Sequence, residues 1–244
     1  MSLTGGEVRR LHQSMSNAAQ NELGSVVSLW RYPVKSMMGE ELNATEVTER
    51  GLLGDRENLR KWPRLFDFRA TVIEPARAAA KVPLVRIALP DGATVTSDPD
   101  DLNQILSKAL NREVTLGAAQ RGAVNAEEYW PDMDGLDHRD TVTDFTLPEE
   151  TFFDVAMVHL LTMATLDRLR ELYPQGRFEV RRFRPNIVVQ LGSSEKSFAE
   201  NAWVGHTLAI GTTVRLKITS PCQRCVMTTL APEGSGNPAH DGPT

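Results

Sequence analysis

The chain's only two cysteines, Cys222 and Cys225, lie three positions apart, and Arg224 stands between them. They follow a strand-like run from Thr213 to Thr219, so their sulfur atoms are expected to project into nearly the same space at the end of a strand. The guanidinium of an adjacent arginine favours the thiolate form of a cysteine electrostatically. A loop of this kind could attack an electrophile, form a disulfide or bind a soft metal.

Two common uses of this cysteine spacing are disfavoured by the rest of the sequence. A structural zinc site needs about four ligands, and the chain has no second cysteine pair. A thioredoxin-like pair opens a helix, whereas Pro221 and the β-branched residues Val226, Thr228 and Thr229 indicate a loop between strands. The spacing alone leaves two inert, buried cysteines as an open interpretation.

Side chains that suit an anionic group occur near the ends of other predicted elements. Lys35 and Ser36 follow a strand predicted at 25–31 and offer an ammonium charge and a hydroxyl donor. Arg56 ends a glycine-bracketed turn, and its planar guanidinium fits a phosphate or a carboxylate. Surface ion pairs and a charged edge strand are the alternative interpretations. Three further arginines precede a proline-held turn: Arg181, Arg182 and Arg184.

Four segments occur in an order that resembles the MOSC family, the domain found at the C-terminus of molybdenum cofactor sulfurases and in amidoxime-reducing components. The segments are Tyr32-Pro33-Val34-Lys35-Ser36, Gly51 to Arg56, Arg182 to Val189, and the Pro-Cys-x-Arg-Cys-x-x-Thr-Thr run from Pro221 to Thr229. Because they extend from Tyr32 to Thr229, the resemblance covers most of the chain.

The resemblance implies a molybdenum–molybdopterin cofactor and assigns residues to it. Cys225 matches the cysteine whose thiolate ligates the metal, so it is the expected catalytic residue. A thiolate also suits a molybdenum that dithiolene sulfurs already bind. Lys35, Ser36 and Arg56 are expected at the cofactor's phosphate. The other expected cofactor contacts are Asp154, Arg184, Asn186, Gln223, Arg224 and Thr228.

For activity, the resemblance implies two-electron reduction of a small N-hydroxylated substrate of the amidoxime type. The chain has too few cysteines for an iron–sulfur cluster of its own, so the electrons would come from an iron–sulfur or flavin partner protein. One alternative is a sulfurtransferase or sulfur carrier, in which Cys225, or Cys222 resolving it, carries a persulfide. A third hypothesis is a cofactor-binding module without turnover.

The composition argues against several other classes of protein. The 244 residues include 27 basic and 32 acidic side chains, and the net charge of −5 argues against a general nucleic-acid-binding surface. No apolar run reaches the ~18 residues of a membrane span, and residues 1–24 lack a signal-peptide core. Because the cysteine pair also suits a reducing compartment, we expect a cytoplasmic protein without membrane contact.

The predicted fold is mainly β with some α, and it consists of an N-terminal β-rich domain packed against a MOSC-type distorted β-barrel. A flexible tail at 1–23, with a short helix near Glu7 to Gln13, precedes the N-terminal domain at 24–118. An acidic connector or lid is expected at 119–150, and the MOSC domain at 151–244.

Hydrophobic periodicity predicts the individual elements. Helices are expected at 99–110, capped by Asp98, and at 162–172, capped by Thr162. His159 lies on an apolar background and is interpreted as a core histidine. Strands are expected at 25–31, 40–48, 66–73, 84–89, 94–96, 114–116, 178–184, 187–191 and 214–219.

Two stretches depart from the family pattern. After Arg56 the relatives continue through a hairpin of about 15 to 20 residues that is missing here. After Thr229 the chain lacks the strands that close the barrel in the relatives, so either the chain is truncated or closure is supplied differently, for example by a partner.

Overall fold

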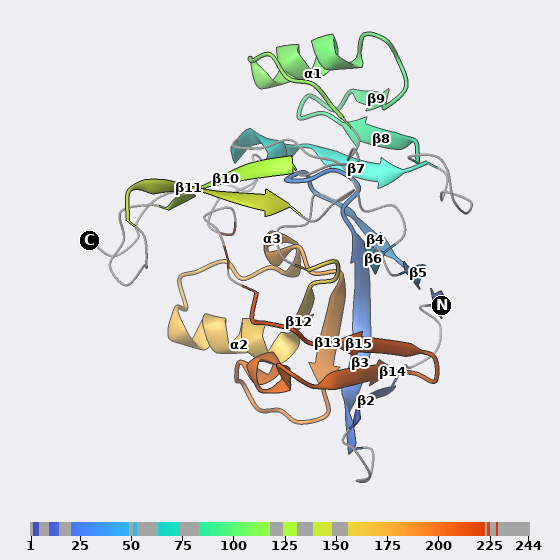
Figure 1. The fold of residues 1–244 in the computed structure, drawn as a ribbon, viewed down its shortest axis with the longest axis vertical. Helices are drawn as coiled ribbons and strands as arrows, with labels where there is room; N and C mark the ends of the chain where they lie inside the picture. The colour runs from blue at the N-terminus through green and yellow to red at the C-terminus, as the bar shows by residue number, and fades with distance from the viewer. Residues whose placement is uncertain are drawn as a thin grey trace.

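Strands dominate the computed structural model, which describes residues 2–4, 10–14, 21–48, 51–52, 63–73, 83–117, 124–130, 139–147, 156–222, 224 and 228. Figure 1 shows a large sheet in the lower half of the molecule and a smaller sheet with one helix at the top. The predicted fold class, mainly β with few helices, is confirmed.

The large sheet contains seven strands drawn from both halves of the chain. Its order is β12-β13-β3-β2-β14-β15, and β4 also pairs with β3. β12 and β13 are parallel, whereas β3 runs antiparallel to β13, β2 and β4. The N-terminal half therefore supplies an interior strand to a sheet completed by the C-terminal half. The strands are β2 (Arg10–Ser14), β3 (Asn21–Arg31), β4 (Glu40–Leu42), β12 (Leu160–Thr162), β13 (Ile187–Leu191), β14 (Thr207–Ile210) and β15 (Val214–Lys217).

β3 is the strand predicted at 25–31, and it begins earlier, at Asn21. Its pairing with β13 places Leu29 opposite Ile187. Gly24 in this strand has no room for a side chain, because a Cβ atom there would lie 2.0 Å from the Gln190 carbonyl oxygen. The glycine therefore allows the two backbones to approach each other closely.

The upper unit is a three-stranded antiparallel sheet covered by one helix. The helix turns Leu102, Leu106 and Leu110 into its core at the spacing of successive helical turns. The same core receives Val34 and Met37 from the connection between β3 and β4, so this unit anchors that connection. The elements are β7 (Arg69–Val72), β8 (Val85–Ala88), β9 (Thr94–Thr96) and α1 (Leu102–Leu110).

Two local predictions around α1 are wrong. The predicted cap Asp98 accepts a hydrogen bond from a neighbouring threonine hydroxyl, and Asp101 occupies the N-cap position. Residues 114–116 form no strand, because the Val114 N–H donates to the Ser107 hydroxyl of the helix over 2.9 Å. Polar side chains of the helix thus satisfy backbone groups that a strand partner would otherwise satisfy.

Two of the predicted strands are shorter than expected. The strand at 40–48 is divided into β4 and β5 (Ala44–Thr48), which belong to different sheets. The strand at 66–73 begins only with β7, since a 3-10 helix, η1 (Pro63–Asp67), occupies its first residues.

The strand predicted at 178–184 is a short helix instead, α3 (Val180–Phe183). The Arg182 N–H donates to the Glu179 carbonyl over 3.0 Å, which is a helical turn rather than a sheet contact. The alternating apolar pattern of this stretch was therefore misleading.

α2 (Met163–Leu172) confirms the second predicted helix and its cap. The Thr162 hydroxyl accepts from the Thr165 N–H over 3.1 Å, and both threonine hydroxyls donate to the Glu200 carboxylate at 2.7 Å. Glu200 belongs to the 3-10 helix η2 (Ala199–Trp203), so the start of α2 is tied to a distant segment.

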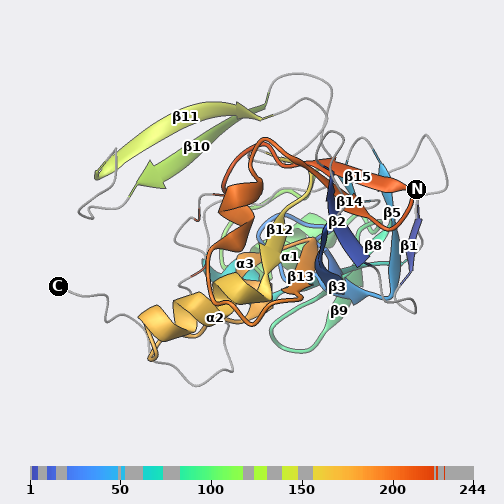
Figure 2. The same cartoon turned by 90° about the horizontal axis from the view of Figure 1, so that it is seen from below.

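Described residues inside the predicted tail and connector form strands. β1 (Ser2–Thr4) pairs with β5, and β2 joins the large sheet, so a helix near Glu7 to Gln13 is wrong for its described part. β10 (Val124–Trp130) and β11 (Thr141–Leu147) form an antiparallel pair that Figure 2 shows to one side of the large sheet. β6 (Gly51–Leu52) pairs with β5. Within the described ranges, no helix has the length and apolar character needed to cross a membrane.

Candidate cofactor site

The connection between β3 and β4 presents Lys35 and Ser36 as the central residues of a turn. The Met37 N–H donates to the Val34 carbonyl over 3.3 Å, and Ser36 has a φ angle of 67°. A positive φ at the third position of a turn usually favours glycine, so the surroundings must hold Ser36 in this conformation. Val34 and Met37 provide part of that constraint because both are buried in the core of the upper unit.

An ion pair closes the base of this turn. Arg31 Nε and Nη2 donate to Glu40 Oε1 at 3.0 and 2.7 Å, and the same oxygen accepts from the Val72 N–H at 2.9 Å. Gly39 lies beside the pair, and a Cβ atom there would be 2.1 Å from the Arg31 carbonyl oxygen. The turn is therefore fixed to both β3 and β7.

Arg184 reaches into the turn from the C-terminal half of the chain. Its Nη1 donates to the Met37 carbonyl, and its Nη2 donates to the Val34 carbonyl at 3.4 Å. The guanidinium carbon lies 4.2 Å from the centre of the Tyr32 ring, within the range of a cation–π contact. Arg184 itself has a φ of 50° directly after α3, which directs the chain from the helix into β13. This side chain therefore holds the Lys35–Ser36 turn in shape.

Asn186 joins three segments around the same site. Its Nδ2 donates to the Trp30 carbonyl at 3.3 Å, and its Oδ1 accepts from the His159 N–H at 3.0 Å. The residue is buried, and its backbone amide also donates to the His159 carbonyl at 2.7 Å. The amide expected at the pterin thus makes contacts to the backbone, which fix the relative positions of β3, β13 and the start of β12. Its contact with a cofactor stays a prediction.

The described residues of the cysteine loop lie against α3. Arg224 Nη2 donates to the Phe183 carbonyl at 2.8 Å, and Arg224 Nη1 lies 2.9 Å from the Cys222 sulfur. From the helix, Arg182 donates to the Thr228 carbonyl at 3.5 Å. Because Arg184 follows α3 directly, the helix connects the cysteine loop to the Lys35–Ser36 turn, and Figure 1 draws it between the two halves of the molecule.

His159 is a partly buried histidine at the centre of these contacts. Desolvation by burial, followed by the positive charge of Arg224, lowers its pKa from 6.5 to about 4, so the ring is neutral at neutral pH. Its Nδ1 lies 3.4 Å from the Arg184 carbonyl oxygen, and a carbonyl can only accept, so a bond there requires the proton on Nδ1. The interpretation of His159 as a core histidine agrees with these contacts.

The described residues fit an anionic group such as a phosphate. The guanidinium groups of Arg184 and Arg224 donate to backbone carbonyls, which hold these two positive charges at the site. Lys35 adds a third cation at the turn, and the exposed Cys222 marks a thiol-bearing loop beside them. Sulfur donors and a cationic surround suit a molybdenum bound through dithiolene sulfurs.

Six of the predicted site residues are described, and they belong to three segments that α3 and Arg184 bring together: Lys35, Ser36, Arg184, Asn186, Arg224 and Thr228. Four lie outside the described residues: Arg56, Asp154, Gln223 and Cys225. The metal ligand itself is in the second group, so its assignment stays a prediction.

Two contributors were missed at the sequence level. Tyr32 stands in the quoted Tyr-Pro-Val-Lys-Ser segment, but nothing in its local pattern indicated that Arg184 would stack on it. Arg182 was noted only as one of three arginines, yet its side chain is buried and contacts the cysteine loop. In the sequence, the only indication of their role was that both residues belong to segments that resemble the MOSC family.

Two family models match the chain in order. The model of the MOSC N-terminal beta barrel domain matches residues 23–144, half of the chain, and the model of the MOSC domain matches residues 149–242. The chain belongs to the MOSC family. The predicted division at 24–118, 119–150 and 151–244 is not tested by these matches, and the MOSC-family sheet observed here takes strands from both matched regions.

The curated relatives of this MOSC-family chain are distant. It is 25% identical over 246 residues to mitochondrial amidoxime reducing component 2 of Rattus norvegicus, a match that covers 87% of this chain and 68% of the relative. It is 26% identical to mitochondrial amidoxime-reducing component 1 of Mus musculus, over 87% of this chain and 67% of the relative. The human component 1 is 24% identical, with 92% and 72% covered. No solved structure gave a significant match.

Proposed function

We propose that this MOSC-family chain binds a molybdenum–molybdopterin cofactor and reduces small N-hydroxylated substrates of the amidoxime type. The observation that carries the proposal is the contact of Arg184 with the Lys35–Ser36 turn. Arg184 donates to the carbonyls of Val34 and Met37, and Val34 lies 150 residues before it in the sequence. This side chain joins the segments that the family resemblance assigns to phosphate and pterin, and the described residues of the cysteine loop contact the adjoining helix α3. The names of the curated relatives support the choice of substrate class.

The residues of the chain have distinct roles in this proposal. Lys35 and Ser36 bind the phosphate at the tip of the turn, with Arg56 as a third donor. Arg184 holds the turn and adds positive charge close to it. When bound, the cofactor supplies two-electron redox chemistry at a metal that the Cys225 thiolate ligates. Further contacts are proposed for Asp154, Asn186, Gln223, Arg224 and Thr228.

The reaction consumes two electrons and two protons for each N–O bond that is cleaved. An N-hydroxylated substrate becomes the corresponding N–H compound, and the oxygen leaves as water. The electrons come from an iron–sulfur or flavin protein, since two cysteines cannot hold a cluster in this chain. His159 is neutral at neutral pH, so it adds no positive charge beside Arg224.

The test is metal analysis of protein produced with abundant molybdenum, together with reduction of benzamidoxime by reduced methyl viologen. Cys225→Ala should lose the metal and the activity, and Cys222→Ala, the same change at the other cysteine, should keep the metal. Lys35→Ala should lower the cofactor content, whereas Lys108→Ala on α1 serves as a charge-matched control. Equal molybdenum content in the parent and in Cys225→Ala contradicts the assignment of Cys225 as the metal ligand. If the parent binds molybdenum but does not reduce benzamidoxime, the protein is a cofactor-binding module without turnover.

A sulfur carrier is the second candidate, because Arg224 Nη1 lies 2.9 Å from the exposed Cys222 sulfur. A guanidinium at this distance can donate a hydrogen bond to the sulfur of a thiol or a persulfide and so hold it in place. Cyanolysis of purified protein distinguishes the two functions. Labile sulfur in the absence of molybdenum favours the carrier, and molybdenum without labile sulfur favours the reductase.

A further inference from the structure

The segment from α2 to Arg184 is basic within an acidic chain. Residues 167–184 include six arginines and three acidic residues, a net charge of +3, whereas the whole chain has a net charge of −5. The remaining residues therefore sum to −8. Positive charge is concentrated where the chain approaches the candidate site.

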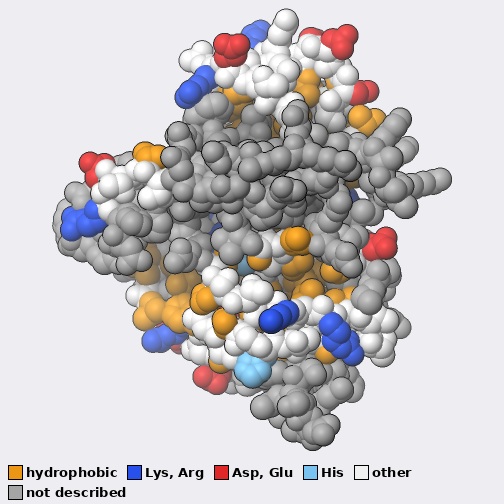
Figure 3. All heavy atoms as spheres, in the orientation of Figure 1, with side chains coloured by type: hydrophobic (Ala, Val, Ile, Leu, Met, Phe, Trp, Pro, Cys, Tyr) orange, Lys and Arg blue, Asp and Glu red, His pale blue; other side chains and the backbone are white. Residues whose placement is uncertain are grey.

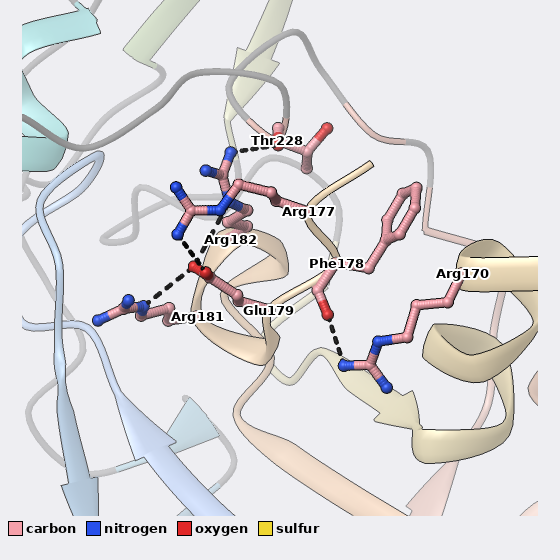
Figure 4. Close-up of polar contacts among 7 residues, drawn as sticks. All are labelled: Arg170, Arg177, Phe178, Glu179, Arg181, Arg182 and Thr228. Carbon is pink, nitrogen blue, oxygen red and sulfur yellow. Dashed lines mark hydrogen bonds and ion pairs between the residues drawn. The ribbon is translucent and has the colours of Figure 1, made fainter. Parts of the chain in front are cut away.

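Four of the arginines of this segment, Arg168, Arg170, Arg177 and Arg181, are exposed, whereas Arg182 is buried. Arg177 and Arg181 both contact Glu179, and Arg182 approaches the same carboxylate, as Figure 4 shows. Three guanidinium groups around one carboxylate leave a positive surplus, and together they keep the pKa of Glu179 below its usual value although its partial burial acts in the opposite direction. The exposed cations have side chains 38 to 49% accessible: Arg168, Arg170, Arg177, Arg181 and Lys196.

Two large apolar side chains lie among these cations. Leu172 and Tyr173, at the end of α2, are 55% and 47% exposed. Figure 3 shows hydrophobic side chains gathered on the left of the lower half, where Figure 1 draws α2, with basic side chains next to them. An apolar centre containing tyrosine, surrounded by arginine, is the composition that protein–protein interfaces favour. We call the surface formed by Arg170, Tyr173, Arg177 and Arg181 the α2–α3 face, because Arg170 and Tyr173 lie against the Gly176–Phe178 segment and Arg177 and Arg181 share Glu179.

The α2–α3 face is continuous with the candidate site. Arg170 Nη2 donates to the Phe178 carbonyl at 2.8 Å, which attaches the end of α2 to the segment that leads into α3. On the other side of α3, Arg224 donates to the Phe183 carbonyl and Arg182 donates to the Thr228 carbonyl. A protein seated on the face therefore lies beside the cysteine loop.

We propose that the α2–α3 face is the docking surface for the acidic face of an iron–sulfur or flavin electron-donor protein. The inference rests on the proposed reductase function and adds to it the place and the charge of the partner. Surface cations around an apolar centre steer an acidic partner and fix its orientation, while the apolar residues provide contact area. Nucleic acid and anionic lipid are the competing occupants, and direct binding measurements distinguish them from an acidic protein.

The test compares two charge-reversal variants of identical net charge. Arg177→Glu combined with Arg181→Glu changes the face, and Arg86→Glu combined with Lys108→Glu is the control on β8 and α1, at the other end of the molecule in Figure 1. The probes are an acidic plant-type [2Fe–2S] ferredoxin and an acidic flavodoxin. Binding to cofactor-loaded protein is measured from roughly 20 to roughly 300 mM salt, across which electrostatic association weakens strongly.

We expect the parent and the control to bind at least one of the two carriers at low salt and the face variant to bind about tenfold or more weakly. Reduction of benzamidoxime with the carrier should fall by the same factor in the face variant, while reduction with methyl viologen should be unchanged. Tyr173→Ser, which keeps the charge, should weaken binding at all salt concentrations. These readings separate docking from chemistry.

Three results overturn the proposal. One is that neither carrier binds the parent in a salt-sensitive manner, and another is that the control loses as much binding as the face variant. The third is that anionic lipid vesicles or RNA bind the face while the carriers do not. Absence of turnover with methyl viologen in the parent contradicts the reductase function instead, and the binding measurements still decide the docking surface.

Discussion

The upper unit and the region around α3 are both well buried, but different chemistry fills them. In the upper unit Phe68, Ile87 and Leu106 are fully buried and pack against other apolar side chains. Around α3 the buried side chains include Arg182 and Asn186, which hydrogen-bond to backbone groups of Thr228, Trp30 and His159. The upper unit is stabilised by burial of apolar surface, whereas the region around α3 is stabilised by hydrogen bonds, which are directional.

This difference determines which region tolerates substitution. An apolar core accepts other side chains of similar volume, because van der Waals contact has little directional preference. A buried donor aimed at a single carbonyl has no such freedom, and removing it leaves the carbonyl without its partner. The chain therefore places sequence-specific positioning next to the candidate cofactor site and less specific stability away from it.

The largest effect is expected in the upper unit. Phe68→Ala should lower the free energy of unfolding by about 4 kcal/mol, because it removes a large side chain and leaves a cavity. Phe68→Leu, which retains most of the volume, should cost much less. Chemical denaturation measures both, and the molybdenum content of the folded protein should be unchanged. Loss of metal in folded Phe68→Leu would contradict the separation of the two regions.

A smaller loss of stability is expected at Asn186, with a larger effect on function. Asn186→Ala should cost about 2 to 3 kcal/mol, since the Trp30 carbonyl and the His159 N–H both lose a buried partner. Asn186→Asp keeps an acceptor for His159 but cannot donate to Trp30, so it should recover only part of the loss. Unfolding and cofactor content are measured on the same preparations. Full stability in Asn186→Ala would refute the bridging role.

The pH dependence of stability should reveal His159. Its pKa is 6.5 in the reference state and about 4 in the native protein, so the unfolded chain binds the proton first. The neutral His159 ring therefore makes its full contribution to the free energy of unfolding above pH 6.5. This contribution decreases as the pH falls toward 4, and about 2 kcal/mol should be lost at pH 5. His159→Gln should remove this part of the dependence between pH 7 and pH 5. Identical curves for variant and parent would show that the ring titrates normally.

The smallest of these stability effects is expected for Arg184→Lys. Lysine keeps the charge but cannot donate to two carbonyls while lying flat on Tyr32, so about 1 kcal/mol should be lost. The main consequence should be weaker cofactor binding, because Ser36 is no longer held at positive φ. Thermal unfolding and molybdenum retention during dialysis test this, with Arg215→Lys on β15 as the control. Equal molybdenum retention in Arg184→Lys and Arg215→Lys would mean that the Lys35–Ser36 turn keeps its conformation without Arg184.

The sequence predicted the elements whose patterns are local. β3, β9, β13, α1 and the Thr162 cap of α2 follow from periodicity and capping alone. α3 was mistaken for a strand because its conformation depends on contacts outside the segment, such as the Arg182 contact with Thr228. The β10–β11 pair was missed because the acidic and turn-forming residues between its two strands, such as Asp132, Asp134 and Gly135, indicated a loop.

The residues of the site were predicted from the four segments that resemble the MOSC family, but the contacts between these residues could not be predicted in this way. Arg184 and Val34 are 150 residues apart, and Asn186 and Trp30 are 156 apart. No local rule of helix or strand formation connects such positions, so the use of Asn186 as a bridge and of Tyr32 as a platform required the fold.

The interior position of β3 in the large sheet has a consequence for biosynthesis. During translation, residues 21–31 leave the ribosome long before β13 exists, so this strand can pair early with β2 and β4 but must wait for β13. Pairing between such distant segments is slow, and an unpaired strand edge is prone to aggregation meanwhile. The newborn chain should therefore depend on chaperones until its last strands emerge, and neither half alone should fold after the chain is divided between them.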